Sequence, residues 1–302
     1  MAQQYHYPIQ DLCRVLAVSR SSYYAWRQRR PGPRAEQNQR LREALCTLFV
    51  ANRKVYGSPR LTLALQAQGI VCSRNRVARH MHHLQIKVRQ KPAFKPKTTD
   101  SNHPHPIAPN RLAGSPKPKA PNRVWVGDIT YISTAQGWLY LAAVMDLYSR
   151  KIVGWATAPH LKTSLVKEAL LQAVHSRHPK AGLLHHSDRG VQYASLDYCQ
   201  LLSSLKALPS MSSKGNCYDN AAMESFWSTL KTESLHQQHF STRRAAHLAI
   251  FDFIETFYNP KRLHSALGYQ SPVDFELSNI HEEKSKNPCP INRRKPKILQ
   301  NP

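Results

Sequence analysis

The chain has 302 residues, enough for two domains, and its 41% of hydrophobic residues can fill compact cores. No apolar run is long enough to span a bilayer, and the N-terminus lacks the apolar segment of a signal peptide, which argues against membrane and secreted proteins. The net charge of +25 favours a polyanionic partner, and nucleic acid more than a membrane surface.

The positive charge is concentrated at the two ends of the chain. Residues 1–123 hold 23 Lys and Arg against 4 Asp and Glu, whereas residues 124–283 hold 14 of each. The segment from residue 284 onward has 6 basic residues and no acidic one. The middle therefore reads as an ordinary globular domain. The six cysteines are scattered without a C-x-x-C pair, which argues against a disulfide framework or zinc finger and favours a cytoplasmic protein.

The N-terminal residues predict a first helix-turn-helix. A helix with Ile9, Leu12, Val15 and Leu16 on one face is followed by a break at "AVS" and by a second helix that starts with Arg20. A further helical block begins near Ala35. Its apolar stripe is Leu41, Leu45, Leu48 and Phe49.

A second helix-turn-helix follows in the same region. The Ser58-Pro59 pair opens its first helix, Gly69 closes that helix, and Ser73 caps the next one. Basic residues at the start of this last helix occupy the end that normally enters the major groove of DNA. We favour DNA binding by residues 1–89 over a purely structural role. The expected DNA contacts are Arg20, Arg74, Arg76 and Arg79.

Residues 90–122 differ from the rest of the chain in composition. Eight of these 33 residues are proline, interleaved with Lys, Ser, Asn and His. Such a segment cannot bury enough apolar surface to fold alone. We expect an extended basic linker here and a domain boundary at its end.

Residues 123–280 predict an α/β domain. "RVWVGDITYIS", "GWLYLAAVMDLYS" and "KIVGWATA" read as three antiparallel strands with short turns. A helix, a strand that ends before Asp188, a second helix, the polar stretch "ALPSMSSKGNCYDN" and further helices follow. This order matches a ribonuclease-H-like core, with a mixed sheet and helices on both faces. Residues 281–302 are expected to be a basic, disordered tail.

Three carboxylates are the candidate catalytic residues. Asp188 ends a short strand, Asp128 lies between apolar residues in the first strand, and Glu224 lies at the edge of the packed face of a helix. Each alone could be structural. Together they form an oxygen-ligand set for Mg²⁺, with Mn²⁺ as a substitute. Two such ions can activate an attacking oxygen and stabilise a leaving one in phosphoryl transfer.

A family resemblance rests on these acids and on longer motifs. Asp188 and Glu224 are separated by 35 residues. The motifs, in order, are "LAVSRSSYYAW", "VYGSPRLTLALQAQG", "WVGDITYI", "AVMDLYSRKIVGW", "HSDRGVQY", "SKGNCYDNAAMESFWSTLKTE" and "FYNPKRLHSALGYQSPVDFE". From about residue 9 to about residue 277 the chain resembles the downstream-frame product of insertion-sequence-three family transposases, bacterial relatives of retroviral integrases.

The resemblance implies a function and a set of residue roles. Asp128, Asp188 and Glu224 fall on the metal-binding acids, and Lys231 falls on a basic position that contacts DNA near the scissile phosphate. The implied activity is cleavage at the inverted-repeat ends of an element and joining of the freed 3′-hydroxyl to target DNA, with two Mg²⁺ ions. The implied partners are double-stranded DNA, further copies of the chain, and an upstream-frame protein or a frameshift fusion with it. The implied location is the bacterial cytoplasm, at the nucleoid.

Several residues and functions stay open at this stage. His185 and His186 flank Asp188, and His186 is a candidate DNA contact, although a packed role is an equal alternative. Asp146 is interpreted as an ion-pair partner of Arg150 or its neighbours, and Asp219 as a helix cap. One rival function is a regulator that binds element ends without catalysis, which the intact acids disfavour. Another is a ribonuclease H acting on hybrids, which the DNA-reading N-terminal region disfavours.

Overall fold

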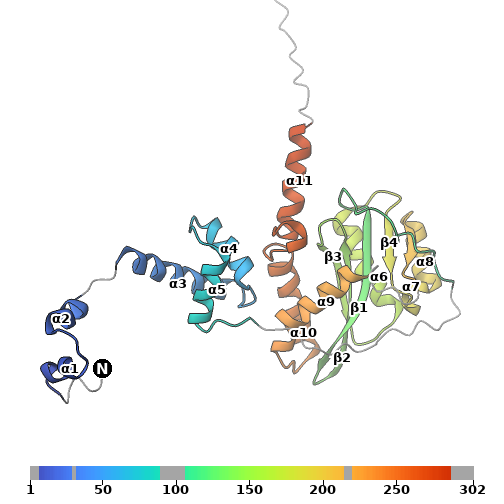
Figure 1. Cartoon of the computed structure of the whole chain (residues 1–302). Coiled ribbons are helices and arrows are strands. Elements are labelled where there is room, and N and C mark those ends of the chain that lie inside the picture. Colours follow the sequence, from blue (N-terminus) through green and yellow to red (C-terminus); the bar gives the residue numbers. More distant parts are fainter. Residues whose placement is uncertain (1–6, 29–31, 89–105, 214–219, 287–302) are drawn as a thin grey trace, which may run out of the picture. The chain divides into compact units, whose positions relative to one another are not determined.

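The computed structural model describes residues 7–28, 32–88, 106–213 and 220–286, and the chain divides into two compact units at residue 88 (Figure 1). The first unit consists of helices and the second is built around a sheet. Within the described ranges, no helix combines the length and the apolar character needed to cross a membrane.

The first unit contains the two predicted helical pairs. Its helices are α1 (Ile9–Val15), α2 (Arg20–Gln28), α3 (Pro33–Ala51), α4 (Ser58–Ala67) and α5 (Arg74–His83). Helices α3, α4 and α5 contact one another, and their buried residues include Leu41, Leu45 and Phe49 of the predicted stripe. The hydroxyl of Ser73 accepts a hydrogen bond from the backbone N–H of Arg76 at 3.3 Å, so the predicted cap of α5 is confirmed.

The apolar face predicted for α1 is wrong for two of its four residues, since Ile9 and Leu12 are half-buried but Val15 and Leu16 are not. Val15 and Leu16 are 80% and 69% exposed, and Cys13 is the buried residue of the helix. The helix ends at Val15 after seven residues and packs against α2. Two turns of helix against one partner can bury only a narrow strip, which here runs through Cys13.

The second unit contains a five-stranded mixed sheet of the predicted ribonuclease-H-like type. Its strands are β1 (Val124–Thr134), β2 (Gly137–Asp146), β3 (Ile152–Ala158), β4 (Leu184–Ser187) and β5 (Leu208–Met211), in the order β3-β2-β1-β4-β5. The first three strands are antiparallel, and β1, β4 and β5 are parallel to one another. Strand β5 was not predicted, because it is four residues long and contains Pro209. An edge strand tolerates proline, since one of its sides has no ladder to complete.

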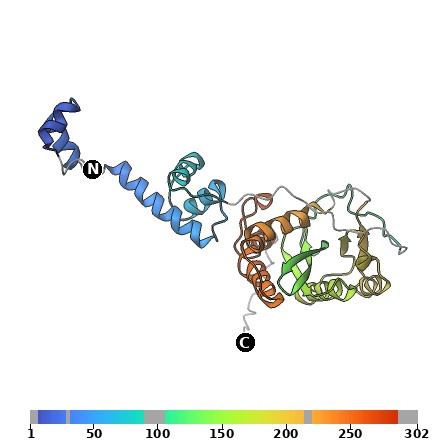
Figure 2. The same ribbon diagram turned by 90° about the horizontal axis from the view of Figure 1, so that it is seen from below.

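Helices cover both faces of the sheet (Figures 1 and 2). On one face lie α6 (Thr163–Arg177), α7 (Val191–Ala194) and α8 (Leu196–Ser204), which bury Trp125 and Val144 among other residues. On the other face, α9 (Ala221–Glu233) contacts β1 and α10 (Arg243–Phe251) contacts β1 and β2. The remaining elements are the short helix η2 (Leu235–Gln237), the π-helical turn η3 (Asp252–Tyr258), the short helix η4 (Ser265–Leu267) and α11 (Pro272–Lys286).

The contact between α6 and β3 requires a glycine at position 154. A Cβ atom there would lie 2.3 Å from the carbonyl oxygen of Ala169 and 2.5 Å from the backbone nitrogen of Ala173. Both atoms belong to the α6 backbone and cannot move without displacing the helix. We therefore expect Gly154→Ala to lower the free energy of unfolding by about 3 kcal/mol.

Urea unfolding followed by tryptophan fluorescence measures this effect, because four of the five tryptophans lie in the sheet unit. Gly57→Ala is the control, since the nearest atom to its added Cβ is 3.8 Å away, an ordinary contact. Equal stability of Gly154→Ala and the parent protein would contradict this packing.

The described part of the segment expected to be a linker lies against the sheet unit. The backbone N–H of Arg111 donates to the hydroxyl of Ser210 at 2.9 Å. The backbone N–H of Asn122 donates to the Asp146 carboxylate at 2.7 Å. At the other end of the unit, α11 continues to Lys286, so the expectation of disorder from residue 281 is wrong for residues 281–286. Residues 89–105 and 287–302 lie outside the described ranges.

Candidate active site

Asp128, in the middle of β1, and Asp188, directly after the end of β4, lie side by side. Strands β1 and β4 are parallel, and their last register pair is Gly127 with Ser187. The next residue of each strand is an aspartate, so the two carboxylates come to adjacent positions. Burial, and next the charge of Asp188, raise the pKa of Asp128 to about 7. The site therefore holds more negative charge than its surroundings stabilise.

Three N–H groups hold the carboxylate of Asp128. Its Oδ2 accepts hydrogen bonds from the Asn220 amide at 2.8 Å and from the Trp227 indole at 3.0 Å. Its Oδ1 accepts from the backbone N–H of Ile129 at 2.8 Å. These bonds favour the ionised form and oppose the effect of burial. The direction of this carboxylate is thus fixed by α9 and by its own strand.

Asp188 ends β4 as the sequence predicts. Its Oδ1 accepts a hydrogen bond from the backbone N–H of Gly190 at 3.0 Å, which turns the chain away from the sheet toward α7. The residue is half-buried. This hydrogen bond orients the carboxylate of Asp188 at the end of its strand.

Glu224 is exposed. Among the described residues, no three His, Cys, Asp or Glu side chains are arranged as a metal-binding group. Glu224 nevertheless shares one side of α9 with Asn220 and Trp227, four residues before it and three after it. Both of those residues bind Asp128, so the helix face that carries Glu224 is turned toward the aspartates.

Lys231 continues the same side of α9 by one more turn. Its amine lies 5.2 Å from the centre of the Tyr131 ring, within range of a cation–π contact. Burial lowers the pKa of this amine, and the negative charge of Asp128 acts in the opposite direction. Lys231 therefore lies next to the acidic site.

Asn220 and Trp227 were not predicted as partners of Asp128. Trp227 was interpreted as a core residue, and it is buried. Its indole N–H also donates a hydrogen bond to the carboxylate. The available signal was the spacing of Asn220, Glu224, Trp227 and Lys231, which places polar groups on one helical stripe beside the predicted acid.

Comparisons with known proteins agree with this geometry. Two integrase core domain families match residues 118–217 and 205–272, and an HTH-like domain family matches residues 36–94. The chain is 46% identical over 264 residues to an insertion element IS600 protein of Shigella sonnei. The matched residues are 87% of this chain and 97% of that protein. It is 38% identical over 279 residues to transposase InsF for insertion sequence IS3A of Escherichia coli (strain K12), and these residues are 92% of this chain and 96% of that transposase. The chain belongs to the IS3 family of transposases.

A third relative fits this assignment. The transposase for insertion sequence element IS904 of Lactococcus lactis subsp. lactis (strain IL1403) is 42% identical over 251 residues, which are 83% of this chain and 99% of that transposase. As an IS3-family transposase with an integrase core, the protein is a DDE-type polynucleotidyl transferase that acts on DNA. Integrase-like core domains are typically dependent on a divalent metal.

The predicted DNA-binding arginines of the transposase lie on α2 and α5. Arg74 and Arg79 are exposed on α5, and Arg20 is exposed at the start of α2. Arg76 is half-buried and donates a hydrogen bond to the Asn38 side chain at 2.9 Å, which ties α5 to α3. Arg74 and Arg79 are therefore the more accessible pair on α5.

His186 is packed inside the sheet unit, which is the alternative that the sequence left open to a DNA contact. Its ring is fully buried, with Nδ1 hydrogen-bonded to the Ser210 hydroxyl at 2.9 Å and Nε2 to the Ser212 hydroxyl at 3.0 Å. These contacts join β4 to β5. His185 is also buried, and burial lowers its pKa to about 4, so it packs as a neutral ring beside Tyr198.

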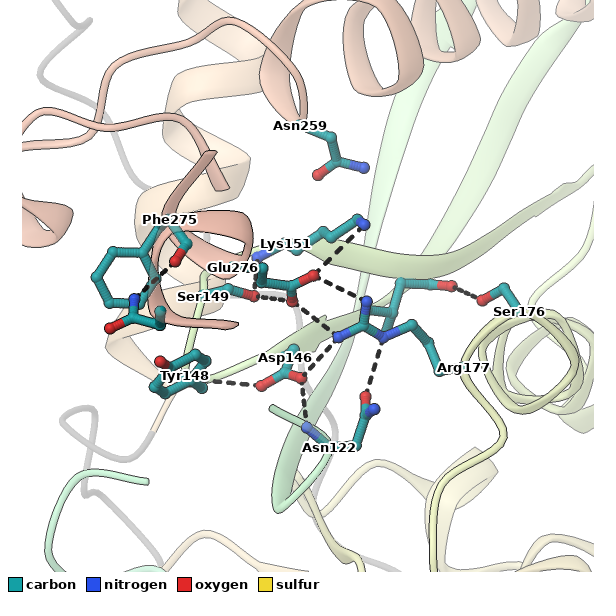
Figure 3. A network of polar contacts seen from close by, with 12 residues as sticks. Asn122, Asp146, Tyr148, Ser149, Lys151, Ser176, Arg177, Asn259, Phe275 and Glu276 are labelled. Carbon is teal, nitrogen blue, oxygen red and sulfur yellow. Dashed lines mark hydrogen bonds and ion pairs between the residues drawn. The ribbon is translucent and has the colours of Figure 1, made fainter. Parts of the chain in front are cut away.

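Asp146 has a different ionic partner from the one expected. It is fully buried, and its Oδ2 lies 3.6 Å from an Nη atom of Arg177 on α6 (Figure 3). The side chain of Arg150 lies near Tyr258 instead. Arg150 was expected as the partner because it is close in sequence, whereas Arg177 is brought to Asp146 by the packing of α6. Asp219, interpreted as a helix cap, lies outside the described residues.

Proposed function

We propose that Asp128, Asp188 and Glu224 together hold the divalent metal with which this transposase cuts and joins DNA. The metal would be Mg²⁺, replaceable by Mn²⁺, with two ions in each site. The observation that carries the proposal is the adjacency of Asp128, within β1, and Asp188, directly after the parallel strand β4. Oxygen ligands of this kind suit both metals.

The residues present fit such a metal. Burial, and next the charge of Asp188, raise the pKa of Asp128, and a bound cation would offset both penalties. Glu224 extends from the side of α9 that faces the aspartates, and an exposed glutamate can change rotamer at small cost. When bound, the metal would activate the attacking oxygen and stabilise the leaving one.

The protein's own groups would orient the site and the DNA. Asn220 and Trp227 hold the Asp128 carboxylate in one direction. Lys231, beside Asp128, would bind a phosphate close to the bond that is cut. The reaction would free a 3′-hydroxyl at each inverted-repeat end and join it to target DNA.

The helical unit would recognise the inverted repeats through Arg74 and Arg79. We expect the double variant Arg74→Ala/Arg79→Ala to bind DNA more weakly and with a flatter dependence on salt. Each lost phosphate contact should reduce the log–log slope by about 0.9. Fluorescence anisotropy of the full chain on repeat DNA across a salt series measures this slope. Lys180→Ala, an exposed change in the sheet unit, is the control. An unchanged slope in the double variant would place the phosphate contacts elsewhere.

Further partners and a location of the transposase are also part of the proposal. We expect several copies of the chain to bridge two element ends, with an upstream-frame protein or a frameshift fusion supplying further DNA binding. We expect the protein to act in the bacterial cytoplasm, at the nucleoid.

A nicking assay tests the proposed function. The full chain is incubated with end-labelled DNA that carries candidate inverted repeats, with Mg²⁺ or with EDTA. The expected result is a nick at the element boundary that depends on the metal. Binding without a nick would favour a regulator, and cleavage of the RNA strand of a hybrid in place of DNA would favour a ribonuclease H.

A further inference from the structure

Two aromatic side chains meet at the hairpin between β1 and β2. The rings of Tyr131 and Trp138 are 4.9 Å apart at their centres and nearly perpendicular, at 88°. Trp138 is 50% exposed, although a tryptophan normally buries most of its surface. A half-exposed tryptophan braced by a second ring leaves an apolar surface for a flat partner.

Two cations flank this aromatic pair. The amine of Lys231 lies 5.2 Å from the centre of the Tyr131 ring. The guanidinium of Arg243, the first residue of α10, donates through Nε to the carbonyl oxygen of Trp138 at 3.1 Å. Aromatic rings with cations beside them suit a ligand that is both planar and anionic.

The hairpin that carries Trp138 is held in place. The backbone N–H of Ala135 donates to the carbonyl oxygen of Phe240 at 2.9 Å, and the backbone N–H of Arg243 donates to the Gln136 side chain at 3.1 Å. Gly137 takes the turn with a φ of 95°, which a glycine adopts without strain. The aromatic pair is therefore presented by a fixed turn.

The aromatic pair and the acidic site share Lys231. Tyr131 lies three residues along β1 from Asp128, and the charge of Asp128 acts on the Lys231 amine. A strand whose phosphate is bound by Lys231 would thus place a neighbouring base near Tyr131 and Trp138.

We propose that Trp138, braced by Tyr131, stacks on an unpaired base of the DNA strand next to the cleaved phosphate. This inference rests on the proposed function, since it takes the bound strand to be the one that is cut. Stacking of a base on an aromatic side chain contributes enough to binding to hold a frayed or displaced nucleotide. Tyr131 and Trp138 would act as positioning residues for the strand and take no part in bond making.

Binding of the full chain to repeat DNA with 2-aminopurine near the cleavage site tests this inference. The assay is run without divalent metal, so that it does not depend on cleavage. We expect the parent protein to quench the 2-aminopurine, Trp138→Ala to lose the quench and bind roughly tenfold more weakly, and Trp138→Phe to retain most of both. Phe251→Ala, which removes a 48% exposed aromatic of α10, should behave as the parent protein does.

Two results would overturn the inference. One is a quench and affinity in Trp138→Ala equal to those of the parent protein. The other is unchanged DNA binding together with a lower sedimentation mass in Trp138→Ala, which would make this surface a contact between protein copies. Circular dichroism and the Trp138→Phe variant separate loss of stacking from loss of folding. Failure of the proposed function would appear separately, as absence of metal-dependent nicking by the parent protein.

Discussion

Replacing Asp188 by asparagine should abolish DNA cleavage and strand transfer while leaving duplex binding intact. The amide keeps the shape of the side chain but removes a charge that a divalent metal needs. Loss of several kcal/mol of transition-state stabilisation corresponds to a fall in cleavage rate of at least about a thousandfold. The rate is read from end-labelled repeat DNA in Mg²⁺, and anisotropy on the same DNA reports binding.

Asp197→Asn is the matched control for this change. Asp197 is an exposed acid in the first turn of α8, and its replacement should leave the cleavage rate unchanged. Asp128→Asn and Glu224→Gln should fail as Asp188→Asn does. If Glu224→Gln cleaves at the parent rate, Glu224 is not a ligand and the third acid lies elsewhere.

The second large effect is expected at Arg177, which joins α6 to α11. Its two terminal nitrogens lie 2.9 and 2.8 Å from the two carboxylate oxygens of Glu276, and Asp146 is 3.6 Å away (Figure 3). Glu276 is 8% exposed and Asp146 is fully buried. Arg177→Met would remove the guanidinium charge that lies beside these two buried acids. We expect it to lower the free energy of unfolding by about 3–5 kcal/mol.

The dependence of this loss on pH distinguishes lost charge from lost packing. Burial raises the pKa of Asp146 to about 6, and Arg177 acts in the opposite direction. A carboxyl whose pKa is raised by folding is destabilising once the pH exceeds that folded pKa, and the penalty disappears below its unfolded pKa. The Arg177→Met deficit should therefore shrink between pH 7 and pH 4 in urea unfolding. Arg244→Met, an exposed change on α10, should have little effect at either pH. A deficit equal at both pH values would assign it to packing alone.

The order of the sheet elements was predictable, and the contacts between distant residues were not. The alternation of β1 and β2 and the strand that ends at Asp188 followed from local pattern. Strand β5 was not predicted because a four-residue segment that contains Pro209 is more typical of a loop. Local pattern also suggested Arg150 for Asp146, whereas the helix α6 brings Arg177 there.

The candidate site was likewise predictable only in part. Asp128 and Asp188 could be grouped from sequence as oxygen ligands, and the parallel pairing of β1 and β4 brings them together. The partners of Asp128 on α9 depend on how that helix docks, which no local pattern specifies. His186 was a candidate DNA contact because it lies close to Asp188, yet its ring is buried between the Ser210 and Ser212 hydroxyls.

Cleavage by Asp188→Cys in two metals tests most directly whether Asp188 is a metal ligand. A thiolate is a poor ligand for Mg²⁺ and a better one for the softer Mn²⁺. The account predicts no nick at the element boundary in Mg²⁺ and a measurable nick in Mn²⁺, with the parent protein active in both. Cleavage by Asp188→Cys in Mg²⁺ at the parent rate would contradict it.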